Sequence, residues 1–156
     1  PVSRPEKFQQ IFSQLTNATN QRLIISKGWA DLAENNSSGI LYVDEMPYEL
    51  LFPRLAAIVH HGGTGTMAAA ARAGIPQVAF PFMADQFENR KHIVKLGLGP
   101  NACDFKKISE KSIAGAIAET LTNNYYKKNA LEIRHKLQNS NGLELTVNLI
   151  ENELNK

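Results

Sequence analysis

The fold of this chain is decided by one stretch, which reads His60-His61-Gly62-Gly63-Thr64-Gly65-Thr66. The apolar residues 55–59 before it predict a buried strand, and the alanine-rich residues 67–73 after it predict a helix. A glycine-rich turn between a strand and a helix N-terminus gathers backbone N–H groups that the helix leaves unpaired, and the helix dipole adds partial positive charge there. The turn is therefore suited to an anion, above all a phosphate, at the C-terminal edge of a parallel sheet.

Strands and helices are predicted to alternate on both sides of this turn. Apolar runs predict strands at residues 22–26, 40–43, 55–59 and 77–80, and a short last one at 99–102. Helices are predicted at residues 4–19, 48–53, 67–73, 86–96, 109–121 and 125–138, with a terminal helix from Asn141 that turns Leu143, Val147, Ile150 and Leu154 inward. This order predicts an α/β fold with a doubly wound, Rossmann-like parallel sheet and a helical C-terminal tail.

One strand of such a sheet is expected to be missing from this chain. The sequence opens with a helix, whereas in the common strand order 3-2-1-4-5-6 the first strand is central. If the strands at 22–26 and 55–59 are the second and fourth, they lie on either side of a gap with unpaired backbone groups. We therefore expect a strand ahead of Pro1, or one from another chain, to complete the sheet.

Composition limits the classes of protein to which this chain can belong. With 43% hydrophobic and 21% charged residues, the 156 residues predict one globular domain, 1–156. A net charge of +2 without a basic, aromatic-rich stripe argues against nucleic acid as a partner. Cys103 is the single cysteine, which excludes an intrachain disulfide and fits a cytoplasmic location. No apolar run approaches the roughly 18 residues of a transmembrane segment.

Three ordered segments carry a resemblance to a known family. They are Val59 to Thr66, Arg72-Ala73-Gly74-Ile75-Pro76, and Pro81-Phe82-Met83-Ala84-Asp85-Gln86, and the pieces at 26–29 and 46–54 agree with them. Together they resemble the donor-binding C-terminal domain of GT-B glycosyltransferases, in particular the sterol glucosyltransferases and antibiotic-modifying enzymes of the UDP-glycosyltransferase superfamily. The resemblance is specific over about residues 1–105 and extends to the helical tail only in character.

This resemblance implies a UDP-sugar ligand and assigns its parts to residues. The donor diphosphate is matched by His61, Gly63, Thr64, Gly65 and Thr66, the donor sugar by Asp85 and Gln86, and the nucleoside by Ser26, Trp29 and Met46. Fixed N–H dipoles and a histidine suit the negative charge that develops on a leaving diphosphate. Neither a metal nor another cofactor is expected, and the sequence has no Asp-x-Asp pair that would hold a metal with the diphosphate.

Simpler interpretations stand beside these assignments. His60 is expected to pack inward as a structural residue, since adjacent strand residues point to opposite faces. Asp85 could simply cap the helix that follows it, which does not exclude sugar binding at the same sheet edge. Trp29 could belong to the core or to the wall of the cleft.

The resemblance implies an inverting transfer of a hexose, with UDP-glucose or a related UDP-hexose as donor and a lipophilic alcohol, such as a sterol or natural product, as acceptor. The catalytic base of this family lies in an N-terminal acceptor domain, so no catalytic residue is assigned in this chain, and alone it is expected to bind UDP weakly without transfer. An alternative is the separate donor-binding subunit of a split glycosyltransferase, with the acceptor domain in trans. A third is an α/β protein that uses the turn for another phosphate ligand. The face toward the acceptor domain could also mediate self-association.

Overall fold

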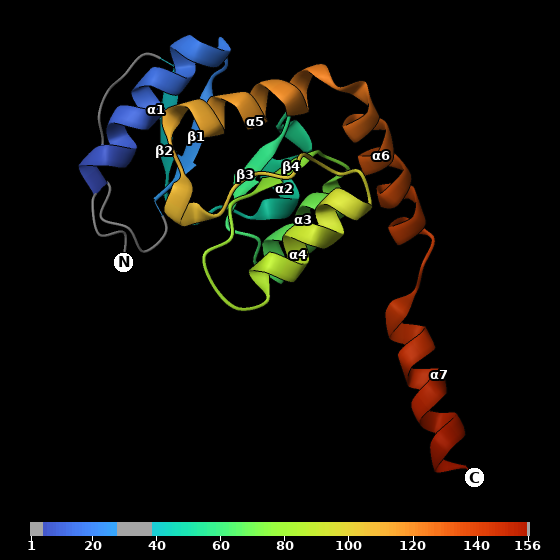
Figure 1. Cartoon of the computed structure of the whole chain (residues 1–156). Helices are drawn as coiled ribbons and strands as arrows, with labels where there is room; N and C mark the ends of the chain where they lie inside the picture. Colours follow the sequence, from blue (N-terminus) through green and yellow to red (C-terminus); the bar gives the residue numbers. More distant parts are fainter. Residues whose placement is uncertain (1–4, 28–38, 156) are drawn as a thin grey trace.

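A computed structural model of the chain describes residues 5–27 and 39–155, and of residues 5–9 it describes only the backbone (Figure 1). The helices are α1 (Pro5–Thr19), α2 (Tyr48–Leu51), α3 (Thr64–Ala73), α4 (Gln86–Lys95), α5 (Glu110–Thr122), α6 (Asn124–Gln138) and α7 (Gly142–Leu154), with short 3-10 helices at Phe52–Arg54 and Phe105–Lys107. The strands are β1 (Leu23–Ser26), β2 (Ile40–Val43), β3 (Ile58–His60) and β4 (Gln77–Ala79).

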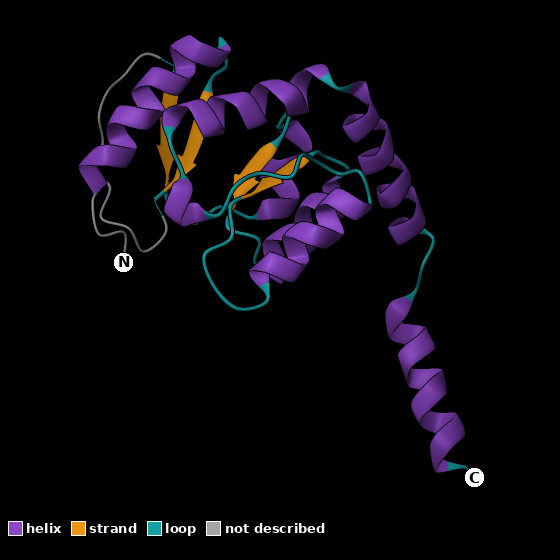
Figure 2. Cartoon of the chain, viewed as in Figure 1, coloured by secondary structure: helices purple, strands orange, loops and turns teal. Residues whose placement is uncertain are grey.

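The strands form two separate parallel pairs. Leu23 of β1 lies opposite Ile40 of β2, and Ile58 of β3 lies opposite Gln77 of β4. Figure 2 shows both pairs pointing in the same general direction, with α5 running across them. The pairs are the two halves of the predicted strand order, and no strand in the described part of the chain joins β1 to β3. The predicted strand at 99–102 is wrong, because those residues form no strand.

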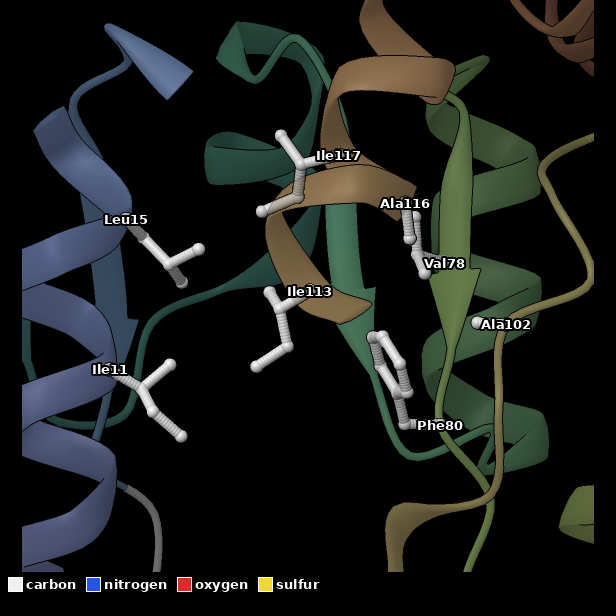
Figure 3. Packing of buried hydrophobic residues seen from close by; sticks show 8 residues of the cluster. All are labelled: Ile11, Leu15, Val78, Phe80, Ala102, Ile113, Ala116 and Ile117. Carbon is white, nitrogen blue, oxygen red and sulfur yellow. The ribbon is translucent and has the colours of Figure 1, made fainter. Parts of the chain in front are cut away.

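Helix α5 connects the two halves through the main hydrophobic core. Ile113 and Ile117 of α5 face Ile11 and Leu15 of α1, and Ala116 lies beside Val78 of β4 (Figure 3). α5 begins where it was expected, because Ser109 and Ser112 form a reciprocal capping box. Both sheet halves are thus fixed to one helix although they share no strand pairing.

An apolar groove of about 840 Å³ separates β1 from β3. Its walls include Ile24 of β1 and Val59 of β3, and Ile113 and Ile117 of α5 also line it. Ile24 and Val59 are 40% and 41% exposed, although residues of their type in the middle of a sheet are normally buried. The groove therefore runs between two strand edges whose apolar side chains are only partly covered.

The C-terminal helix corrects one expectation. α7 projects away from the rest of the chain (Figure 1), and none of its residues is buried. The prediction that Leu143, Val147, Ile150 and Leu154 face inward is therefore wrong, because nothing in the described part of the chain covers them. Within the described ranges, no helix combines the length and apolar character needed to cross a membrane.

Candidate functional site

The glycine-rich turn between β3 and α3 forms the centre of the site. Gly62 has a φ of +93°, and a Cβ placed there would lie 3.1 Å from the carbonyl oxygen of Gln86, so both the backbone conformation and the close approach require glycine. Gly63 is the N-cap of α3, and the first helical hydrogen bond runs from Met67 N to Gly63 O. The N–H groups of residues 64–66 therefore have no carbonyl partner within the helix. Thr64 and Gly65 are exposed, so these donors are open to a ligand.

His60 holds this turn from the sheet side. The backbone N–H of Gly62 donates to Nδ1 of His60 at 3.1 Å, and Nε2 lies 3.1 Å from Oε1 of the fully buried Gln77. Because Oε1 can only accept, Nε2 carries the proton and Nδ1 is free to accept, which is the neutral ring. Burial lowers the pKa of His60 from 6.5 to about 4; the bond to Gln77 opposes this and the nearby His61 adds to it. The structural role expected for His60 is confirmed.

His61 points to the other side and is exposed. Its ring lies against Phe82, with ring centroids 5.9 Å apart. A Cβ on Gly63 would come within 2.5 Å of Nε2 of His61, so the imidazole lies directly over the glycine at the start of α3. A histidine in this place can donate a hydrogen bond to an anion bound at the helix N-terminus.

Asp85 lies beside the turn and is held there by side chains. Its Oδ2 accepts from the hydroxyl of Thr64 at 3.1 Å and from Nδ2 of Asn89 at 3.1 Å. Its side chain makes no capping hydrogen bond to α4, so the interpretation of Asp85 as a simple cap is wrong. The carboxylate instead links α4 to α3, and within residues 5–27 and 39–155 its hydrogen bonds use Oδ2, which leaves Oδ1 for a ligand.

Gln86 is 7% exposed and supports the loop that precedes it. Its Oε1 accepts from the backbone N–H groups of Phe82 and Met83, at 3.0 and 3.2 Å. Both hydrogen bonds found for this side chain among the described residues use Oε1, so the Nε2 amide is the part that can meet a ligand.

The residues expected at the nucleoside lie elsewhere or outside the described part. Ser26, at the end of β1, lines the groove together with His61. Met46 follows β2 and is 42% exposed, and it does not line that groove. Trp29 lies outside the described residues. The structure thus brings together the residues assigned to diphosphate and sugar, with Ser26 across the groove.

Sequence reasoning missed the role of Gln77, and for Asn89 it offered only support of the sugar site, from the helical spacing of Glu88 and Asn89 after Asp85 and Gln86. Gln77 fixes the ring of His60, and Asn89 donates from Nδ2 to Gly62 O at 2.8 Å and to Thr64 Oγ1 at 3.1 Å. Asn89 follows Asp85 by one helical turn, so the i, i+4 spacing places both on one face of α4. That spacing was the available signal, but it does not reveal the contact with the turn. The fold and site thus define an α/β domain with parallel strands and a glycine-rich turn at a helix N-terminus, an arrangement suited to an anion.

Comparisons with known proteins assign the family. A family model described as "Erythromycin biosynthesis protein CIII-like, C-terminal domain" matches residues 17–151. The chain is 31% identical over 157 residues to the sterol 3-beta-glucosyltransferase UGT80B1 of Arabidopsis thaliana, covering 99% of this chain and 25% of that protein. It is 41% identical over 122 residues to the vancomycin aglycone glucosyltransferase of Amycolatopsis orientalis, covering 78% of this chain and 30% of that protein. The chain belongs to this family of C-terminal domains of GT-B glycosyltransferases.

Solved structures agree with this fold. The spinosyn rhamnosyltransferase SpnG has a TM-score of 0.80 at 19% identity, over 96% of this chain and 41% of that chain. In a structure of SpnG complexed with thymidine diphosphate, the TM-score is 0.74 at 20% identity, over 86% of this chain and 37% of that chain. The chain therefore spans less than half the length of these proteins, and a third or less of the two curated relatives.

Proposed function

We propose that this domain binds a nucleoside diphosphate sugar, with the diphosphate at the N-terminus of α3 and the sugar at Asp85 and Gln86. The N–H groups of residues 64–66 and the imidazole of His61 supply the donors for the phosphates. Oδ1 of Asp85 and the amide nitrogen of Gln86 supply an acceptor and a donor for sugar hydroxyls.

The observation that carries this proposal is the hydrogen bond between Thr64 and Asp85, at 3.1 Å. It places a carboxylate next to the start of α3, where an anion is expected. A carboxylate there repels a phosphate ion that binds alone. It can accept hydrogen bonds from hydroxyl groups, so it suits a ligand in which a diphosphate is joined to a hydroxyl-bearing group. A nucleoside diphosphate sugar has this combination.

The donor base and the acceptor are finer proposals. Our preferred donor is UDP-glucose or a related UDP-hexose, since two curated relatives are named as glucosyltransferases, whereas SpnG is a rhamnosyltransferase solved with thymidine diphosphate. The acceptor is a lipophilic alcohol, as the sterol and aglycone names of the relatives suggest. We expect inverting transfer with a base from a separate acceptor domain, so that residues 1–156 alone bind the donor without transfer.

Calorimetry with UDP, thymidine diphosphate and UDP-glucose tests the binding proposal. His61→Ala is expected to weaken UDP binding by about 10- to 100-fold, the range for one hydrogen bond to a charged group. Equal affinity of both chains for UDP would contradict the assignment of His61. Tighter binding of thymidine diphosphate than UDP would overturn the choice of base but leave the site in place.

Gln86 permits a test of the sugar half with a matched pair of variants. Gln86→Glu keeps an oxygen for the N–H groups of Phe82 and Met83 but removes the amide donor, so it should fold normally and lose preference for UDP-glucose over UDP. Gln86→Leu leaves both N–H groups unpaired and should also lower the free energy of unfolding by about 1–3 kcal/mol. A Gln86→Glu chain that binds UDP-glucose like the wild type would refute the sugar contact.

We also propose that a fifth parallel strand fills the groove between β1 and β3. Leu23 N and Lys27 N bond to the β2 side, and Ile58 N bonds to the β4 side, so the backbone groups of Ile24 and Val59 face the groove. Helix α1 runs back against the direction of β1 (Figure 1), as the helix of a right-handed crossover from a neighbouring parallel strand does. The occupant is therefore an apolar extended segment of the same polypeptide that leads into α1.

Hydrogen exchange on the longest polypeptide that carries this domain tests the fifth strand. The amides of Ile24 and Val59 should exchange as slowly as those of Ile25 and Ile58, whose strands are already paired. Fast exchange at Ile24 and Val59 beside slow exchange at the other two would show that the groove stays open.

A further inference from the structure

The amide of Asn89 lies at the junction between the two halves of the proposed site. Asn89 is 8% exposed, and its Nδ2 lies 2.8 Å from Gly62 O, 3.1 Å from Thr64 Oγ1 and 3.1 Å from Asp85 Oδ2. These three oxygens come from the glycine turn, from the first residue of α3 and from the N-cap of α4. One nitrogen therefore connects the segments assigned to phosphate and to sugar.

The hydrogens of this network can be allotted. The carbonyl of Gly62 and the carboxylate of Asp85 only accept, and the hydroxyl of Thr64 donates to Asp85. Asn89 has two N–H bonds, so one serves Gly62 and the other serves the Thr64–Asp85 pair. The hydroxyl hydrogen of Thr64 is thereby committed to Asp85, and a phosphate at α3 meets the backbone N–H of Thr64.

The same hydrogen bonds partly offset the negative charge of Asp85. A carboxylate beside a diphosphate site repels the ligand unless donors hold it. Asn89 and Thr64 both direct hydrogens at Oδ2, which reduces the negative potential toward the turn and leaves Oδ1 for another partner.

We propose that Asn89 is a positioning residue for donor binding: it fixes Asp85 relative to the glycine turn, so that one rigid ligand can reach both. This role rests on the proposed function, because it assumes that the ligand contacts both halves. Asn89 itself does not touch the ligand and acts through Asp85, Thr64 and Gly62.

The Asn89→Asp variant distinguishes a positioning role from a purely structural one, because only the positioning role predicts a pH-dependent loss of affinity. This substitution keeps the shape but replaces the donor by a carboxylate facing Asp85. Near pH 8 both carboxylates are ionised, and UDP-glucose should bind at least about 30-fold more weakly than to the wild type. Near pH 5.5 two adjacent carboxylates share a proton. The shared proton restores a donor toward Asp85, so the deficit should shrink at least about fivefold.

Asn89→Ala is the matched control, since it removes the donors without adding charge. Its deficit should be about tenfold and the same at both pH values. Expressing each affinity relative to the wild type at the same pH removes the effects of pH that the wild type and the variants share, the titration of His60 included. Glu88→Gln, at an exposed neighbour on α4 that bonds Lys91, should bind like the wild type.

The outcomes separate this role from the proposed function. Equal, pH-independent deficits for Asn89→Asp and Asn89→Ala, or lower thermal stability with unchanged affinity, would overturn the positioning role. Should Asn89→Ala fail to fold, Thr64→Val removes the other donor to Asp85 and should give the same pH-independent deficit. A wild-type chain that binds neither UDP nor UDP-glucose would overturn the proposed function itself, and the role of Asn89 with it.

Discussion

The neutral state of His60 predicts that this domain loses stability in mild acid. The folded chain holds the pKa of His60 at about 4, against 6.5 for a free histidine. Below pH 6.5 the unfolded chain therefore binds a proton that the folded chain does not. The stabilising contribution is complete above pH 6.5 and is lost as the pH falls toward 4.

The magnitude follows from these two pKa values. Linkage gives a loss of about 2 kcal/mol in the free energy of unfolding between pH 8 and pH 5, and about 3 kcal/mol well below pH 4. The main physical reason is burial, which penalises the charged ring of His60, and protonating Nδ1 would also remove the acceptor for Gly62 N. The turn at the start of α3 should therefore be among the first parts to loosen.

Urea denaturation of the wild type and of His60→Asn measures this loss. Asparagine places its oxygen near the position of Nδ1, so it can accept from Gly62 without titrating. His60→Asn should be less stable than the wild type at pH 8, because Oε1 of Gln77 loses its hydrogen bond to His60. The part of the pH dependence that is due to His60 should vanish in this variant. Equal loss of stability in both chains between pH 8 and pH 5, or an NMR titration of His60 near 6.5, would refute the reasoning.

Three further predictions concern single features of the fold. Gly63→Ala should weaken UDP binding about tenfold in calorimetry, since the added Cβ displaces His61. The added Cβ of Gly65→Ala meets no atom within 4 Å, so this variant should leave the free energy of unfolding in urea unchanged or slightly higher. Removing residues 142–156 should change the free energy of unfolding by less than about 0.5 kcal/mol, because α7 buries none of its residues, and a larger loss in urea would show hidden packing. Arg90→Met should lower the melting temperature and cost about 2 kcal/mol, because Arg90 bonds Ala102 O and Asp104 at 2.7 and 2.8 Å; an unchanged melting temperature would contradict this.

The strands show which parts of the fold the sequence could predict. Apolar runs at 22–26, 40–43 and 77–80 became β1, β2 and β4 within one residue at each end, because an extended apolar segment has few alternatives to burial. The run at 55–59 became a strand only from Ile58 to His60, since β3 extends only where β4 pairs with it. Where a strand ends is decided by its partner, which a local pattern does not contain.

Helix α7 shows that a sequence pattern can predict the bounds of an element without predicting what it packs against. The period of its apolar residues correctly predicts a helix from Gly142 to Leu154. Periodicity identifies an apolar face but says nothing about what covers it, so the inward orientation was wrong. The site divides in the same way: alternation along β3 separates His60 from His61, whereas the contacts of Gln77 and Asn89 join residues 17 and 27 positions apart.

The contacts around Gly62 divide the glycine-rich motif into a supporting part and a binding part. Its N–H donates to His60 and its C=O accepts from Asn89, so this residue offers no backbone donor to a ligand. In the proposed function, the diphosphate therefore meets backbone donors from Gly63 onward, where the N–H groups of α3 begin. Because hydrogen bonds within the protein hold both groups of Gly62, they fix the direction in which those N–H groups point. Donors fixed in advance need little reorganisation when negative charge arrives, and this is the property that a site for a leaving diphosphate requires.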